Sequence, residues 1–306
     1  MNLAESIKQR ATELGFSKVG IAAAQPSTHA PHFQAWLEAG KHGDMAWLEK
    51  RFAERADVAN YLPGAKSVIC CAISYHVKLP EDPRPTAGKI AKYALGEDYH
   101  KHFKNRLHQL ADWLRERADC ETRACVDTAP VLEREWHARA GVGWQGKNTC
   151  TIDTKLGSFL LLGEIVTTLD LAADEPAVDR CGTCTRCIDA CPTDAITPYE
   201  VDATRCISYW TIEHRGEIPA ELSSKFGNWM FGCDICQDVC PWNRKALPAT
   251  DPAVLPKPQL STGTLDAAEV VKWTPEHYQV TLRGTAIKRV KLPQLQRNAR
   301  IVLEHS

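Results

Sequence analysis

Eight cysteines between positions 181 and 240 constrain this 306-residue chain more than any other feature. The first four have the spacing C-x2-C-x2-C-x3-C-P, which runs through Cys181, Cys184, Cys187, Cys191 and Pro192. In two-cluster ferredoxins this spacing wraps three thiolates around one 4Fe-4S cluster and carries the fourth to another cluster. The spacing therefore predicts two 4Fe-4S clusters and an electron-transferring protein.

The second cysteine group is degenerate, since its C-x2-C-x3-C-P pattern (233–241) lacks a leading cysteine and only Cys206 is unassigned nearby. We assign cluster one to Cys181, Cys184, Cys187 and Cys240, and cluster two to Cys206, Cys233, Cys236 and Cys191. Zinc is the alternative, because C-x2-C pairs also form tetrahedral zinc sites. Three closely spaced cysteines with a Cys-Pro pair favour iron and sulfur.

The rest of the chain predicts a soluble, cytoplasmic protein with no membrane partner. Residues 1–16 space apolar side chains among charged ones, as an amphipathic helix does, and lack the apolar run of a secretory signal. The longest apolar stretch, 159–166, is far shorter than the ~20 residues that span a bilayer. In a reducing compartment, clustered thiols bind metal rather than form disulfides. The remaining cysteines are expected to be buried small hydrophobic residues in strand-like settings: Cys70, Cys71, Cys120, Cys125 and Cys150.

Helical and strand patterns alternate over residues 1–175, which predicts an α/β (α+β) domain. Helices are expected at 3–15, 101–118 and 132–140, and strands at 18–23, 67–74, 121–126, 149–152 and 158–167. Residues 176–245, after an acidic and proline-containing linker, are expected to form an inserted two-cluster ferredoxin-like domain. Residues 246–306 begin with a proline-rich stretch and are expected to end as a short helical tail.

Two features could carry chemistry in the first segment. Residues 141–149, GVGWQGKNT, satisfy G-x-G-x-x-G and nearly satisfy the phosphate-loop pattern, but both motifs should follow a strand and 132–140 is helical. The glycines are expected to close that helix and to let the backbone approach a ligand. Asp127 ends an apolar strand, so burial would raise its pKa and let it donate a proton near neutrality. An N-cap for a helix near Pro130 is an equal alternative for Asp127.

The C-terminal segment is basic although the net charge of the chain is only −1. Residues 281–300 hold six basic side chains and no acidic one: Arg283, Lys288, Arg289, Lys291, Arg297 and Arg300. Such a stripe suits a polyphosphate partner, and it equally suits a solvated helix face.

Seven blocks, in order over nearly the whole chain, resemble the epoxyqueuosine reductase family. They are GEDYH (96–100), VDTAPVLER (126–134), GWQGKNT (143–149), GSFLLLGEI (157–165), CISYWTIEHRG (206–216), GCDICQDVCPWN (232–243) and RGTAIKR (283–289). The resemblance implies a cobalamin-binding α/β domain related to those of reductive dehalogenases, a two-cluster module and a tRNA-contacting tail. It further implies a two-electron deoxygenation of epoxyqueuosine to queuosine at the tRNA anticodon, the last step of queuosine biosynthesis. The chain ends without the HEAT-type repeats of longer members.

The resemblance also implies residue roles. Asp127 takes the proton-donor position, and Tyr99 and His100 of GEDYH, which could also simply begin a helix, face the substrate or cofactor pocket. The expected corrin contacts are Lys147, Asn148, Ser158 and Arg55, with Ser208 between cluster and corrin. The expected RNA contacts are Arg215, Arg283, Lys288, Arg289, Lys291 and Arg297. An external low-potential donor such as ferredoxin or flavodoxin would supply electrons, and a monomer is expected.

Two other functions fit parts of the sequence. A corrinoid reductive dehalogenase-like enzyme would share the cofactors, but such proteins are usually exported and need no basic tail. A non-catalytic ferredoxin-type electron carrier would need only the clusters. Cobalamin binding separates the carrier from both enzymes, and tRNA binding separates the two enzymes from each other.

Overall fold

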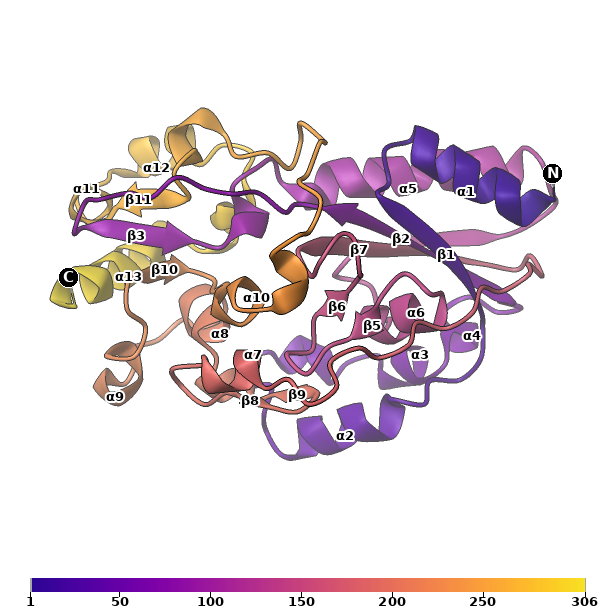
Figure 1. Cartoon of the computed structure of the whole chain (residues 1–306), viewed down its shortest axis with the longest axis horizontal. Helices are drawn as coiled ribbons and strands as arrows, with labels where there is room; N and C mark the ends of the chain where they lie inside the picture. The colour runs from indigo at the N-terminus through magenta and orange to yellow at the C-terminus, as the bar shows by residue number, and fades with distance from the viewer. Residues whose placement is uncertain (1, 306) are drawn as a thin grey trace.

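The computed structural model describes residues 2–305 and is built on a four-stranded antiparallel sheet (Figure 1). Its strand order is β1 (Lys18–Ala23), β2 (Ser67–Ser74), β7 (Leu160–Thr167) and β4 (Thr122–Cys125). Every residue of β2 is buried, because the strand is central and both faces of the sheet are covered. This explains why its sequence, SVICCAIS, is a continuous run of small and apolar residues.

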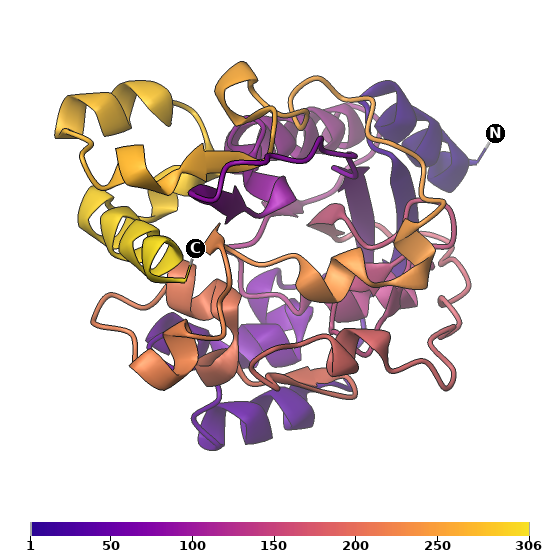
Figure 2. The same cartoon turned by 60° about the vertical axis from the view of Figure 1, so that its left-hand side comes forward.

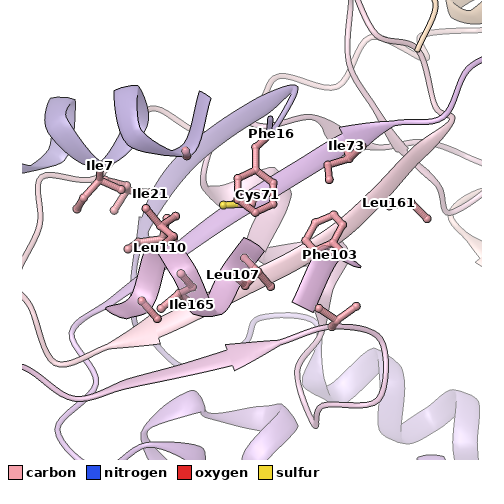
Figure 3. Packing of buried hydrophobic residues seen from close by; sticks show 14 of the residues in the cluster. Ile7, Phe16, Ile21, Cys71, Ile73, Phe103, Leu107, Leu110, Leu161 and Ile165 are labelled. Carbon is pink, nitrogen blue, oxygen red and sulfur yellow. The ribbon is translucent and has the colours of Figure 1, made fainter. Parts of the chain in front are cut away.

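Helices cover the two faces of this sheet. One face packs against α1 (Leu3–Glu13) and α5 (Tyr99–Arg115), and Cys71 and Ile73 of β2 point into that layer (Figure 3). Ile69 of β2 belongs to the same cluster of buried residues. The alternate residues of β2, Val68, Cys70 and Ala72, pack on the other side with Trp136 of α6 (Glu133–Arg139). Side chains alternate along a strand, so both layers draw on the same eight residues. Beyond α6 lie α2 (Ala30–Glu38), α3 (Phe52–Ala56) and α4 (Val58–Tyr61) (Figure 1).

A second sheet joins parts of the chain that are far apart in sequence. Its central strand β3 (Ala87–Ile90) pairs in parallel with β10 (Trp229–Phe231) and antiparallel with β11 (Thr264–Asp266). The helices that pack on this sheet are α11 (Ala267–Val270), α12 (Pro275–Thr281) and α13 (Leu292–Glu304). Each of the ranges 1–175, 176–245 and 246–306 thus contributes one strand, and the three ranges share this core.

The cysteine-rich segment consists of short elements and loops. Its helices are α7 (Arg186–Asp189), α8 (Ile207–Ile212), α9 (Ala220–Ser223) and α10 (Ile235–Asp238), and its hairpin is β8 (Ile196–Thr197) with β9 (Glu200–Val201). The segment packs below the second sheet and beside the hairpin of β5 (Trp144–Gln145) and β6 (Thr151–Ile152) (Figures 1 and 2). Single 3-10 turns complete the chain: η1 (Ala46–Leu48), η2 (Lys92–Ala94), η3 (Ala203–Arg205), η4 (Pro241–Asn243), η5 (Pro258–Leu260) and η6 (Ala286–Arg289).

The mixed α/β fold and the elements expected in the first segment are confirmed, with ends that agree to within three residues. Gly141 closes α6 with a φ of 68°, so the first glycine of 141–146 ends a helix as expected. No helix within residues 2–305 is long and apolar enough to cross a membrane.

Candidate functional site

The four cysteines assigned to cluster one line a single cavity of about 240 Å³. Its walls are Cys181, Cys184, Cys187, Cys240, Lys147, Asn148, Ile152, Arg180, Arg186, Pro241 and Trp242. Cys240 is distant in sequence and reaches the other three because α10 packs against α7. The structure therefore brings together the four thiols that the sequence assigns to one cluster. They surround a cavity and do not converge on a single atom-sized site.

The other four cysteines also lie near one another. Burial raises the pKa of the Cys233 thiol, and the charges on Cys206 and Cys191 add to that rise. The Cys206 residue precedes α8, and the backbone N–H groups of Ser208 and Tyr209 hydrogen-bond its sulfur. The Ala195 N–H donates to Cys191 Sγ at 3.3 Å. Backbone N–H groups directed at thiolates are the surroundings that iron-sulfur clusters use to set their potentials.

A single zinc ion does not suit these thiols. Zinc–sulfur bonds of about 2.3 Å require the ligating atoms to converge on one point. Within residues 2–305 no three His, Cys, Asp or Glu side chains converge in this way. A cavity walled by four thiols has the room that a cubane needs.

Three residues expected to contact a corrin form hydrogen bonds that fasten the first segment to the cysteine-rich one. Lys147 Nζ donates to the carbonyl oxygens of Gly182 at 2.7 Å and Cys184 at 3.1 Å. The Asn148 amide donates to the Cys236 carbonyl at 3.3 Å. The hydroxyl of Ser158 donates to Gln237 Oε1 at 3.0 Å. These bonds hold the cluster loops against the first segment, and contact of the three residues with a corrin stays a prediction.

Arg55 lies apart from this group. It is buried in α3, where its guanidinium donates to the Lys50 carbonyl and lies 6.0 Å from the Phe33 ring centroid. No hydrogen bond recorded among residues 2–305 joins it to the other expected cofactor contacts. Ser208, by contrast, adjoins cluster two through its N–H bond to the Cys206 sulfur.

The expected catalytic aspartate stands at the end of β4 in contact with the start of α5. Asp127 has a φ of 51°, the left-handed conformation that Asp tolerates better than most residues. Its Oδ2 accepts from the Tyr99 hydroxyl at 3.1 Å and lies 2.9 Å from His100 Nε2. The other ring nitrogen of His100 lies 2.8 Å from Asp98 Oδ1, and Asp98 caps α5. Tyr99 and His100 thus begin a helix and also face Asp127.

The expectation that Asp127 has a raised pKa is wrong. Its hydrogen bond with His100 outweighs the partial desolvation of the group and lowers the pKa of the Asp127 carboxyl. The same bond, with that to Asp98, raises the pKa of His100 to about 9. At neutral pH the pair is therefore a carboxylate and an imidazolium, and the mobile proton resides on His100. The N-cap alternative is also wrong, because Asp127 binds side chains of α5 and α6 begins only at Glu133.

Glu133 holds the turn that presents Asp127. Its Oε1 accepts the backbone N–H of Asp127 at 2.7 Å. Burial, followed by the charge of Glu164, raises the pKa of Glu133 well above its ordinary value. Glu164 and His137 are completely buried behind it, with His137 Nδ1 3.2 Å from Glu164 Oε1. Sequence reasoning missed Glu133, although it lies in the block VDTAPVLER.

Aromatic and basic side chains surround the Asp127 centre. The ring of Tyr93 lies 6.1 Å from the Tyr99 ring in an edge-on arrangement. Arg289, from the C-terminal segment, forms two hydrogen bonds to Glu213 at 2.8 and 3.2 Å, and its charge helps to lower the pKa of Asp127. The tail therefore reaches the same centre as β4 and α5.

The basic residues expected to contact RNA fall into two groups. Arg215, Arg283, Arg289 and Lys291 are exposed, and Lys288 is half-buried with its Nζ 2.6 Å from Gln279 Oε1. Arg297 instead donates to the carbonyls of Trp210 at 2.8 Å and His214 at 3.2 Å. Burial lowers the pKa of its guanidinium. The Arg297 side chain therefore connects α13 to α8 and to the segment that follows it through hydrogen bonds within the protein.

The other cysteines divide as well. Cys70, Cys71 and Cys125 are buried in strands, as expected, but Cys120 and Cys150 are only half-buried and lie outside strands. A hydrogen bond with Cys150 is the largest cause of the raised pKa of Cys236. Cys150 therefore adjoins cluster two, which its spacing in the sequence did not indicate.

Comparisons with known proteins give one consistent family. Residues 55–128 match the family described as "Epoxyqueuosine reductase QueG, DUF1730", and residues 180–243 match "4Fe-4S double cluster binding domain". The chain is 45% identical to the epoxyqueuosine reductase of Leadbetterella byssophila, over 98% of both chains, and 42% identical to that of Pseudomonas aeruginosa, over 98% of this chain and 85% of the other.

Solved structures agree. A crystal structure of epoxyqueuosine reductase with an epoxyqueuosine-modified tRNA-Tyr stem loop matches with a TM-score of 0.92 at 30% identity, over 99% of this chain and 81% of that one. A structure of the Bacillus subtilis epoxyqueuosine reductase matches with a TM-score of 0.90 at 28% identity, over 99% of this chain and 81% of that one. In that structure the loop of the catalytic aspartate is swung out of the active site. The chain belongs to the epoxyqueuosine reductase family of enzymes.

Proposed function

We propose that this epoxyqueuosine reductase reduces epoxyqueuosine to queuosine in a tRNA anticodon and opens the epoxide at the Asp127 centre. The observation that carries the proposal is the contact of Asp127 Oδ2 with both the Tyr99 hydroxyl and His100 Nε2. An epoxide oxygen that gains negative charge needs a proton donor within hydrogen-bond reach. The imidazolium of His100, held against Asp127, meets that need at neutral pH.

The cofactors of this function are two 4Fe-4S clusters and a cobalamin, which together supply low-potential electrons at a cobalt centre when they are bound. The thiol-lined cavity supports one cluster on Cys181, Cys184, Cys187 and Cys240. The neighbouring thiols of Cys191, Cys206, Cys233 and Cys236 support the other.

Two unpaired polar atoms support cobalamin binding. Within residues 2–305, the Thr151 hydroxyl and His76 Nδ1 are buried without a hydrogen-bond partner. Thr151 lies two residues after the end of GWQGKNT, and the His76 ring stacks 5.4 Å from Phe159 of GSFLLLGEI. These two blocks are the ones that the resemblance assigns to the corrin. Buried polar groups rarely stay unpaired, so each is available to a ligand.

Side chains of this protein supply and orient the protons that the reaction consumes. Conversion of an epoxide to an alkene and water consumes two electrons and two protons. His100 holds one proton at Nε2, and the Asp127 carboxylate orients and can relay it. The side chain of Asp127 is 54% exposed, so solvent can restore the proton after it is used. Glu133 positions Asp127 through the 2.7 Å bond to its N–H.

The exposed basic residues of the tail are the proposed RNA contacts. Arg215, Arg283, Arg289 and Lys291, with Lys288, would bind phosphates of the anticodon stem, as their exposure allows. Arg289 lies near enough to Asp127 to influence its pKa, so RNA held there would deliver its modified base to the centre. Arg297 is left out of this set because its donors are used internally.

The Asp127→Asn variant tests the proposal. Asn also tolerates a positive φ, so the turn should survive while the carboxylate charge is lost. Both cofactors should still bind, and single-turnover reduction of epoxyqueuosine in tRNA should fall by at least about a hundredfold. Near-normal single-turnover reduction by this variant would remove Asp127 from its role.

A further inference from the structure

An ion pair is completely buried between α6 and the four-stranded sheet. Glu164 of β7 and His137 of α6 are both inaccessible to solvent, and His137 Nδ1 lies 3.2 Å from Glu164 Oε1. The surrounding layer is built from apolar residues such as Trp136 and Val166. Burial of two charges is unfavourable, and apolar residues of similar size are often at least as stable in such a position. Packing alone therefore does not account for this pair.

The contacts of His137 identify it as a cation. Its Nδ1 lies 2.8 Å from the Glu133 carbonyl oxygen, and its Nε2 lies 3.1 Å from the Cys71 carbonyl oxygen. Carbonyl oxygens only accept hydrogen bonds, so both ring nitrogens must carry hydrogen, which is the case only in the imidazolium. Burial acts to lower the pKa of His137, but the contact with Glu164 and the two carbonyl bonds outweigh it, so the pKa is raised.

Glu164 supplies the charge that balances this cation. Within residues 2–305 no hydrogen bond reaches either of its oxygens, so the neighbouring imidazolium is its main compensation. Burial raises the pKa of Glu164, and the His137 cation opposes that rise. Its partners in register are Cys70 of β2 and Cys125 of β4, and burial raises the pKa of both thiols. Burial also raises the pKa of Tyr61, beside Cys125, to about 12, so these three groups are uncharged at neutral pH.

Glu133 is one acid more than this charge balance needs. Its Oε1 accepts the N–H of Asp127 at 2.7 Å, so the backbone of the Asp127 turn depends on it. Burial raises the pKa of Glu133 most, followed by the charges of Glu164 and Asp127. The Asp127 N–H and the charge of Arg134 oppose this rise without cancelling it. A charged Glu133 would add a third carboxylate to those of Glu164 and Asp127.

We propose that the buried Glu164–His137 ion pair keeps Glu133 in its uncharged acid form, so that a neutral acceptor holds the Asp127 turn. Glu164 and His137 are then positioning residues that act through Glu133. The consequence for the reaction rests on the proposed function. The epoxide oxygen gains negative charge as the ring opens, and a second carboxylate beside Asp127 would oppose that charge. A neutral Glu133 holds the turn without opposing it.

The test follows the titration of His100, whose pKa of about 9 depends on the charge of Asp127 and should respond to charge next to it. Protein with both clusters, labelled with carbon-13 histidine, is titrated by NMR, and the His100 signal is identified by its absence in His100→Gln. In Glu133→Gln the amide mimics the uncharged acid, so the His100 midpoint should stay within about 0.2 pH units of wild type. In Glu164→Gln the His137 cation loses its partner and Glu133 should ionise, so the midpoint should rise by about half a pH unit or more.

Two further variants isolate the charge of Glu133. The double variant Glu133→Gln with Glu164→Gln should lose the rise, because no carboxyl group is left to ionise beside Asp127. Glu135→Gln is the matched control, since Glu135 is also buried in α6, with 3% exposure, and accepts the Thr28 N–H at 2.9 Å. Its midpoint should equal that of wild type.

Single-turnover reduction should follow the same order, with a loss of about tenfold in Glu164→Gln and recovery in the double variant. A loss that the double variant shares would mean that the pair acts on the fold and not through Glu133, which would overturn the proposal. An unchanged midpoint in folded Glu164→Gln would also overturn it. So would a lower midpoint in Glu133→Gln, which decides the matter even if Glu164→Gln does not fold. The NMR titration needs no turnover, so the expected midpoints in a protein that forms no queuosine would contradict the proposed function alone.

Discussion

His100 Nε2 and Asp127 Oδ2 lie 2.9 Å apart, so the carboxylate that follows β4 is held against an imidazole from the start of α5. The pair joins the first turn of α5 to the end of β4. It also places an imidazolium beside a carboxylate at the edge of the sheet, where the tail residue Arg289 contributes positive charge.

This ion pair should give stability a defined pH dependence. The pKa of His100 rises from 6.5 to about 9 on folding, so its contribution is complete below about pH 6.5 and is lost as pH rises through 9. The pKa of Asp127 is lowered, so its contribution is present above the ordinary carboxyl range and is lost as pH falls through the lowered value. In urea unfolding, the difference in unfolding free energy between wild type and His100→Gln should be constant below about pH 6.5 and shrink as the pH rises from about 6.5 to 9. A difference that does not change with pH would contradict the pairing.

Glu133 should act as a positioning residue, and two substitutions separate this role from general acid catalysis. In Glu133→Gln the amide oxygen can still accept the Asp127 N–H, so single-turnover reduction should stay within about threefold of wild type. In Glu133→Leu the acceptor is lost, and the rate should fall by about tenfold or more while iron content is unchanged. Equal losses in both variants would mean that the acidic proton of Glu133 matters, and not the bond to Asp127.

The tail cations should contribute affinity for tRNA that depends on salt. Charge reversal of Lys288 and Arg289 should weaken tRNA binding and reduce the salt slope by about two, one for each lost phosphate contact, without bleaching the clusters. Unchanged binding would place the RNA surface elsewhere. Arg297→Leu should behave differently, because its bonds to the Trp210 and His214 carbonyls are internal. It should destabilise the fold by about 1–3 kcal/mol and leave the salt slope unchanged.

The number of irons bound by the protein should fall when a cysteine from either set of four thiols is replaced. Two 4Fe-4S clusters hold about eight irons, and loss of one ligand should remove about four. Cys240→Ser should therefore lose the cluster of the 240 Å³ cavity and Cys206→Ser the other, each detected by iron analysis of the anaerobic protein. Cys120→Ser is the control, since Cys120 is half-buried outside both sets, and it should keep all iron. Loss of iron from the control alone would contradict the assignment.

Much of the site follows from local sequence. The strand SVICCAIS, the grouping of Cys240 with Cys181 and the block GEDYH at the start of α5 all depend on spacing or on short-range pattern. The ferredoxin spacing already implies that a distant fourth cysteine returns, and the cavity shows that Cys240 does so.

The features that the sequence did not reveal depend on contacts between distant segments. The pKa of Asp127 falls because His100, 27 residues earlier, meets it across the end of the sheet. Burial alone, which is all that the strand ETRACV indicates, would raise it. Likewise, the sequence does not distinguish Arg297 from the other basic residues of the tail. Its internal role depends on the packing of α13 beside α8, which brings its guanidinium to the Trp210 carbonyl. The second sheet draws β3, β10 and β11 from three separate ranges, and no local pattern specifies such pairing.

An anaerobic assay with cobalamin, a low-potential reductant and tRNA that carries epoxyqueuosine tests the account most directly. Nucleosides from the digested tRNA are identified by mass. The account predicts that the reconstituted wild-type chain, with about eight irons and a bound corrinoid, converts epoxyqueuosine to queuosine and that omission of cobalamin abolishes conversion. Queuosine formed equally well without any corrinoid, or no queuosine from a fully loaded enzyme, would contradict it.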